Sequence, residues 1–229
     1  QNPVRKGGDA AMLFELESLP LLIARMMYLD RKNLALEICK AFVRTDSLID
    51  TADKLKGFFS LTQVLLKKPT DYEVDSESNP KQELQTFSRI FHLIKNRRSI
   101  DETFSLIQNV TSSIQTLEPE IKEHLYLALG SVLLRIAVEI DKNGDATTTV
   151  RKVLQEFYSF LIPKNNPPQE PAFWLFLEGS LISDRCGTET ITTEFFVQAY
   201  NIWREPNFSA DLKFRMFVKM VRTATEFRN

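Results

Sequence analysis

The sequence is poor in the residues from which compact catalytic and metal sites are built. Its 229 residues include 2 histidines, 2 cysteines and 7 glycines. No GxGxxG, P-loop, HExxH, CxxC or GxSxG motif is present, so nucleotide binding, zinc-protease chemistry and a serine nucleophile have no support from a motif. Cys39 and Cys186 are distant in sequence, which argues against a disulfide scaffold and favours a reducing compartment.

Strong net charge and long apolar runs are also missing. The net charge is -1 and the pI about 6.2, so no global positive field attracts nucleic acid or an anionic membrane. The basic pairs Lys67-Lys68 and Arg97-Arg98 are too small to indicate nucleic-acid binding. No segment approaches 18 apolar residues, and the N-terminal QNPVRKGG lacks both Met and a signal core, which predicts an internal fragment of a longer protein.

The residues that are plentiful favour helices. Hydrophobic residues make up 43% of the chain and 17 are Phe, enough to bury a core. Apolar residues recur at helical spacing, and the few glycines lie near breaks, which predicts an all-α protein. We expect helices at 9–18, 21–30, 33–44, 84–94, 99–115 and 119–140, and a pair of helices at 170–204. Three further helices are expected: one that begins at Asp50 or Thr51, one that ends near 162, and one that begins at Ser209.

Several local signals place these helices. Ser99 and Glu102 form an S-x-x-E capping box, and Pro119 suits a first helical turn. Gly130, inside a helix, predicts a closely packed neighbour. Helix starts near 99, 146 and 190 are roughly 45 residues apart, the period of HEAT or armadillo-like helix pairs. We therefore predict that 1–229 is a single α-solenoid segment, with a mobile acidic surface loop at 67–80; an acidic docking motif is the alternative for this loop.

The segment 170–204 is the most apolar part of the chain. Its first helix is apolar almost all round, which predicts burial between successive layers, and Gly179-Ser180 is where a neighbouring backbone can approach most closely. Trp174 is expected in the core. Trp203, near a helix end, is expected to be half-buried, with an interface contact as the alternative.

The remaining residues that could be catalytic or metal-binding have simpler structural interpretations. His92 is expected to pack or hydrogen-bond on its helix, and His124 to be exposed. Asp141, Asn143 and Asp145 alternate as calcium ligands do, but the glycine and Lys152 fall where an EF-hand does not place them, so we read a turn ending in an N-cap. The sequence thus identifies no catalytic, cofactor-binding or metal-binding residue and no cofactor, and it leaves the partner-contacting side chains unknown.

Three strings carry a resemblance to a known family. FSRIFHLI at 87–94 follows the acidic loop, and LFLEGSL at 175–181 precedes EFFVQAY at 194–200. In this order and spacing the chain resembles the Vps35 family, the large scaffold subunit of retromer, over roughly 19–227. Ser180, where that family more often has Ala, marks a divergent member.

The resemblance implies a non-enzymatic α-solenoid scaffold in endosome-to-Golgi or endosome-to-plasma-membrane transport. It implies a Vps29-like partner, a Vps26-like partner bound through a region outside this sequence, since the PRLYL motif is missing, and sorting nexins as further partners. It also implies a cytoplasmic protein, peripheral on the cytosolic face of endosomes through its partners, that binds no nucleic acid. A retriever-type Vps35-like paralogue, a vesicle coat or a transport receptor is the alternative, and an enzyme is the third hypothesis.

Overall fold

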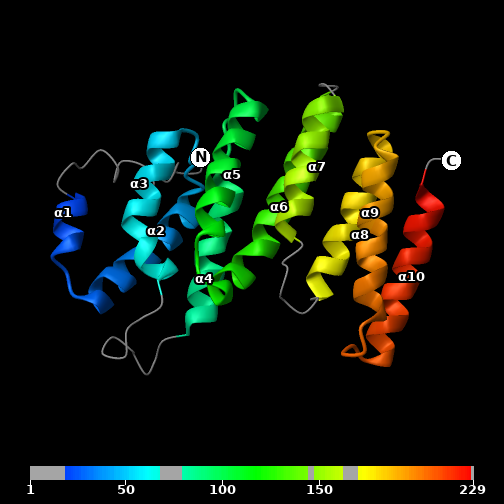
Figure 1. Ribbon diagram of the computed structural model, residues 1–229. Coiled ribbons are helices and arrows are strands. Elements are labelled where there is room, and N and C mark those ends of the chain that lie inside the picture. Colours follow the sequence, from blue (N-terminus) through cyan, green and yellow to red (C-terminus); the bar gives the residue numbers. More distant parts are fainter. Residues whose placement is uncertain (1–18, 68–78, 144–146, 162–169, 228–229) are drawn as a thin grey trace, which may run out of the picture. The chain divides into compact units, whose positions relative to one another are not determined.

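The computed structural model describes residues 19–67, 79–143, 147–161 and 170–227. These residues form helices throughout, as predicted, and their β structure is limited to an isolated bridge between Ile49 and Ile94. The chain divides into two compact units, residues 1–128 and 129–229. In each unit successive helices pack side by side, the arrangement of an α-solenoid (Figure 1).

The first unit is organised around α2. Its helices are α1 (Leu19–Ala24), α2 (Tyr28–Thr45), α3 (Ala52–Thr62), the 3-10 helix η2 (Gln63–Leu66), α4 (Pro80–Ser88), the 3-10 helix η3 (Arg89–Leu93), α5 (Ile100–Gln115) and the start of α6 (Pro119–Asn143). Helices α3 and α4 both pack on α2. Phe42, Phe58, Phe87 and Phe91 form a chain of ring contacts, with centroids 5.5 to 5.9 Å apart, through this core.

The second unit contains the rest of α6, α7 (Thr147–Leu161), α8 (Glu170–Arg185), α9 (Glu189–Arg204) and α10 (Ala210–Glu226). Helices α8 and α9 form an extensive contact with each other. At its centre the buried rings of Phe157, Phe176 and Phe195 meet with centroids 5.2 to 6.0 Å apart. Phe173 and Leu177 of α8 are fully buried as well, whereas Leu175 and Leu181 are only partly buried, so the predicted burial holds for part of this helix.

Two loops of the first unit are tied together beside the isolated bridge. The backbone N–H of Ile49 donates to Leu93 C=O at 3.0 Å, and that of Lys95 donates to Ile49 C=O at 3.2 Å. Asn96 completes the junction, because its side-chain amide donates to Asp50 C=O at 3.2 Å. The ends of α2 and η3 are therefore fixed to each other by backbone bonds as well as by apolar packing.

The predicted capping box forms only in part. Ser99 Oγ accepts from Glu102 N at 3.1 Å, as predicted. The Glu102 carboxylate instead accepts from the Asn96 side-chain amide, and the N–H of Ser99 donates to Asn96 Oδ1 at 3.2 Å. The prediction that the Ser99 N–H donates to the Glu102 carboxylate is wrong, because this N–H donates to Asn96, which the loop junction holds in place.

Two expected boundaries also differ. The break predicted near Asp30 is wrong, since α2 begins at Tyr28 and runs through that position. Asp30 lies in the first turn of α2, where the positive end of the helix dipole stabilises its carboxylate. Asp141 and Asn143 belong to the last turn of α6 rather than to a turn. The predicted helix at 9–18, the acidic loop apart from its ends and most of the proline-rich loop before α8 lie outside the described residues.

Candidate interaction surface

The residues with catalytic chemistry are dispersed. His124 is exposed in the first turns of α6, as predicted. His92, which was expected to pack or hydrogen-bond, is exposed on the 3-10 helix η3. Within the described residues, no group of three or more His, Cys, Asp or Glu side chains is placed to hold a metal ion. Neither Cys39 nor Cys186 takes part in a disulfide bond.

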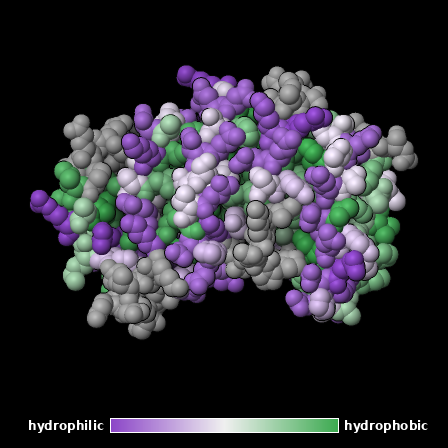
Figure 2. Space-filling model, viewed as in Figure 1, coloured by the Kyte–Doolittle hydropathy of each residue, from purple (hydrophilic) through white to green (hydrophobic). Residues whose placement is uncertain are grey.

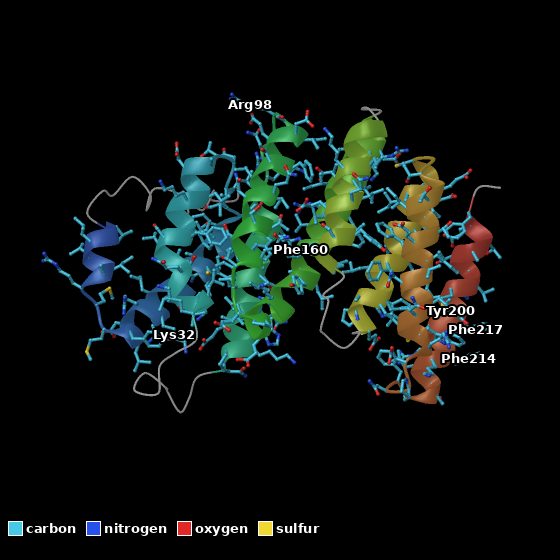
Figure 3. The ribbon with its side chains drawn as sticks, in the orientation of Figure 1. Lys32, Arg98, Phe160, Tyr200, Phe214 and Phe217 are labelled. Carbon is cyan, nitrogen blue, oxygen red and sulfur yellow. The ribbon has the colours of Figure 1, made fainter. Side chains whose placement is uncertain are left out.

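Apolar side chains gather instead on the exposed side of α9 and α10. We define the α9–α10 surface as Val197, Tyr200, Trp203, Phe214, Phe217 and Val221. Phe214 is 68% exposed, and Phe217 and Val221 are each 47% exposed. Figure 2 shows hydrophobic side chains along the edge that α10 forms, and Figure 3 shows Tyr200, Phe214 and Phe217 close to one another. Contiguous exposed apolar surface of this kind marks interaction sites in soluble proteins.

The sequence of α10 produces this surface because the helix has two apolar faces. Met216, Met220 and Thr223 are buried against the unit. Phe214, Phe217 and Val221 follow the i, i+3, i+7 spacing and lie on another face. Ser209 starts the helix, since its hydroxyl accepts from Leu212 N at 3.3 Å.

Aromatic contacts connect α10 to α9. The Trp203 ring lies 5.6 Å from that of Tyr200 and 6.0 Å from that of Phe217, measured between centroids. Trp203 Nε1 donates to the Lys213 C=O at 3.1 Å, which satisfies the polar end of the ring. The Arg204 guanidinium lies 5.8 Å from the centre of the Tyr200 ring, within cation–π range. Hence Trp203 is half-buried, as predicted, and holds an aromatic group that is partly open to solvent.

Other sequence candidates have structural roles. Trp174 is only partly buried, contrary to the expected core position, because its Nε1 donates to the Glu170 carboxylate at 3.3 Å at the start of α8. The Ser180 hydroxyl, fully buried, donates to Leu177 C=O at 2.7 Å within its own helix. A serine in place of alanine is therefore compatible with this packing.

Glycines in α6 and α8 do mark close approaches, as predicted, but to side chains. A Cβ added at Gly179 would lie 2.8 Å from the Phe195 ring, and one added at Gly130 would lie 3.2 Å from Leu161. The atoms nearest to both positions belong to side chains, so the expected approach of a backbone at Gly179 is wrong.

Exposure of α9 and α10 was the feature that sequence reasoning missed. Phe217 and Val221 fit an amphipathic helix as well as Met216 and Met220 do, so periodicity alone does not say which set is covered. The one usable signal was the excess of apolar positions on α10, too many for one buried face. None of the described helices has the length and apolar character needed to cross a membrane.

Comparison with known proteins gives one consistent match. The family model described as vacuolar protein sorting-associated protein 35 matches residues 1–229. Three relatives from Arabidopsis thaliana, the vacuolar protein sorting-associated proteins 35A, 35B and 35C, are similar to the chain with 26%, 25% and 27% identity. Each alignment covers 89% of this chain and 27% of the relative, so the chain spans about a quarter of the length of these proteins.

Proposed function

Because the chain belongs to the Vps35 family, we propose that it is a scaffold segment of a retromer-type complex in endosomal protein sorting. The observation that carries the proposal is the family match over residues 1–229. The all-α fold supports it, since stacked helix pairs present long surfaces to other proteins. In this proposal the chain has no enzymatic role and binds no nucleic acid.

We assign the proposed partners as follows. The α9–α10 surface contacts a Vps29-like subunit, because its exposed aromatic groups have the composition of interface hot spots. A Vps26-like subunit is expected to need residues outside this sequence, since no PRLYL motif occurs here. In this proposal the chain is linked to sorting nexins, and associates with the cytosolic face of endosomes, through these partners. The 229 residues act as a single solenoid segment, through which α6 runs without a break between the two compact units.

The proposal is tested by capture of purified subunits on the immobilised chain. We expect a Vps29-like subunit to be retained and a Vps26-like subunit to pass through. Phe214→Ser combined with Phe217→Ser should weaken retention by about tenfold or more, the usual effect of removing aromatic anchors. Leu21→Ser is the matched control, since Leu21 is 70% exposed on α1.

Three results would contradict all or part of the assignment. Failure of the chain to retain a Vps29-like subunit would count against the proposed role. If the chain retained only a retriever-type homologue of that subunit, the paralogous complex would be favoured. Equal retention by the double variant and the wild-type chain would remove the α9–α10 surface from the proposal while leaving the scaffold role in place.

A further inference from the structure

A second surface feature of the second unit is a groove of about 670 Å³ between α7 and the beginning of α9. Its α7 wall consists of Arg151, Leu154, Gln155 and Tyr158, at helical spacing. Its other wall is the α8–α9 turn and the first turns of α9, residues 187–191 and Glu194. No residue of the α9–α10 surface lines it. The volume lies in the range of grooves that bind small ligands and short peptides.

The α7 wall of the groove is partly apolar and is held by packing. Leu154 is fully buried, and the Tyr158 ring stacks on Phe195 with a centroid distance of 5.8 Å and an interplanar angle of 22°. Phe195 is itself fixed between Phe157 and Phe176. Because these side chains already have their packed positions, a ligand would not need to order them on binding.

Hydrogen bonds fix the other wall. The buried Thr188 hydroxyl donates to Ser183 C=O at 2.9 Å, and the Ser183 and Thr192 hydroxyls are 2.9 Å apart. The Thr192 hydroxyl also donates to Thr188 C=O at 3.2 Å. The start of α9 is thereby held to the end of α8, and the position of its outward side chains is set by buried contacts.

The rim of the groove carries more negative than positive charge. Glu189 and Glu194 are exposed on the α9 wall, and Arg151 is exposed on the α7 wall. In the described part of the chain, neither carboxylate forms a salt bridge. A cation lying along the α9 wall would meet two carboxylates within about one and a half turns of helix.

We propose that this groove binds an extended segment of a partner protein in which an apolar side chain is flanked by lysine or arginine. The apolar side chain packs on Tyr158 and Ile191, which are both partly exposed, and the flanking cations lie against Glu189 and Glu194. The Gln155 carboxamide and the Tyr158 hydroxyl offer hydrogen bonds to the peptide backbone. The binding site goes beyond the scaffold role and does not depend on the identity of the retromer-type subunits.

The probe is a fluorescein-labelled peptide of ten residues, with one leucine flanked by two lysines in an alanine background. Fluorescence polarisation with the 229-residue chain should give saturable binding that weakens as salt is raised from 50 to 300 mM, since exposed charge pairs are screened. Matched peptides replace the lysines by glutamate or the leucine by serine. Both replacements should weaken binding at least fivefold.

Three variants locate the site. Gln155→Trp places a large ring in the groove and should abolish binding, while Glu189→Gln combined with Glu194→Gln should weaken it about fivefold. Glu226→Gln, at an exposed carboxylate of α10, is the matched control and should bind as the wild type does. Thermal melting of each variant checks that the fold is intact. Stronger binding of the glutamate peptide, no saturation by 1 mM protein, or unchanged binding by Gln155→Trp would overturn the proposal.

Discussion

The thiols of Cys39 and Cys186 lie in different surroundings. Cys39 is fully buried in α2, and burial raises the pKa of its thiol to about 12. Cys186 is partly exposed and its thiol donates to the Asp141 carboxylate at 3.5 Å. Because thiolates are the reactive species, we expect a disulfide reagent such as Ellman's reagent to modify Cys186 in the native protein and Cys39 only after unfolding.

The raised pKa of Cys39 also predicts a dependence of stability on pH. The native state holds this proton more tightly than the unfolded state, whose thiol titrates near pH 9.0. The contribution is therefore complete below pH 9.0 and is lost as the pH rises towards about 12, by up to about 1.4 kcal/mol per pH unit. In urea titrations at pH 8 to 10.5, Cys39→Ala should show a shallower loss of stability than the wild type, and Cys186→Ala should not.

An ion pair with little exposure joins α2 to α4. Lys32 Nζ lies 2.8 Å from Glu83 Oε1, and the two side chains are 9% and 17% exposed. Glu83→Gln leaves the Lys32 ammonium in a poorly solvated position, and we expect a loss of about 2 kcal/mol in the free energy of unfolding. Adding Lys32→Met should recover most of this loss, as measured by urea denaturation followed by circular dichroism.

The chain contains a matched control for this pair. Lys40 and Glu37 lie at the same distance of 2.8 Å, but their side chains are 52% and 59% exposed. Glu37→Gln should leave the denaturation midpoint nearly unchanged, because solvent screens exposed pairs. Equal effects of the two Glu→Gln changes would show that burial of Lys32 is not the source of the energy.

At the scale of elements, replacing glycine by alanine is expected to have opposite effects on stability at Gly179 and at Gly130. In Gly179→Ala the new Cβ would lie 2.8 and 2.9 Å from ring atoms of Phe195, and that ring is held by Phe157 and Phe176. We expect a loss of about 1–2 kcal/mol after the gain in helix propensity, with a larger loss for Gly179→Leu.

In Gly130→Ala the new Cβ would meet the ends of the Leu161 and Leu175 side chains at 3.2 to 3.3 Å, and these ends can shift. The gain in helix propensity of about 1 kcal/mol should then leave the protein equally stable or slightly more stable. Urea denaturation of both variants measures the contrast. A stable Gly179→Ala protein would refute the close packing of α8 on α9.

Local chemistry explains which elements could be predicted from the sequence. Thr51, Ser99 and Ser209 cap helices as expected, because each needs only the backbone N–H three residues ahead. The change to a 3-10 helix at Arg89 was not predicted. The bond from Asn96 to Glu102 was missed because Asn96 is positioned by the loop junction, where its side-chain amide also donates to Asp50 C=O. The α9–α10 surface and the groove were missed for a similar reason: each depends on which face a neighbouring helix covers.

At the scale of the whole molecule, the two tryptophans permit a test of cooperativity. Trp174 and Trp203 both belong to the unit formed by residues 129–229, whereas circular dichroism reports helices of both units. Helix α6 runs through the boundary at 128–129 without a break. We therefore expect tryptophan fluorescence and circular dichroism to give the same urea midpoint, as in a single cooperative transition.

Different midpoints would contradict the proposal of a single solenoid segment. A later fluorescence transition would mean that residues 129–229 remain folded after residues 1–128 have unfolded. Gly179→Ala supplies the control, because it perturbs only the second unit directly and should move both probes together if the units are coupled.

The loop junction at Ile49 and Ile94 has a consequence for the order of folding. The bond from Asn96 to Asp50 joins residues 46 positions apart, so forming it closes a long loop, at an entropic cost that local helices do not have. We expect this closure to follow the docking of α3 and α4 on α2, and the junction to be among the first parts of this unit to open on heating. Amide hydrogen exchange at Ile49 and Lys95 would report it: these amides should be protected, yet should open before those of α2.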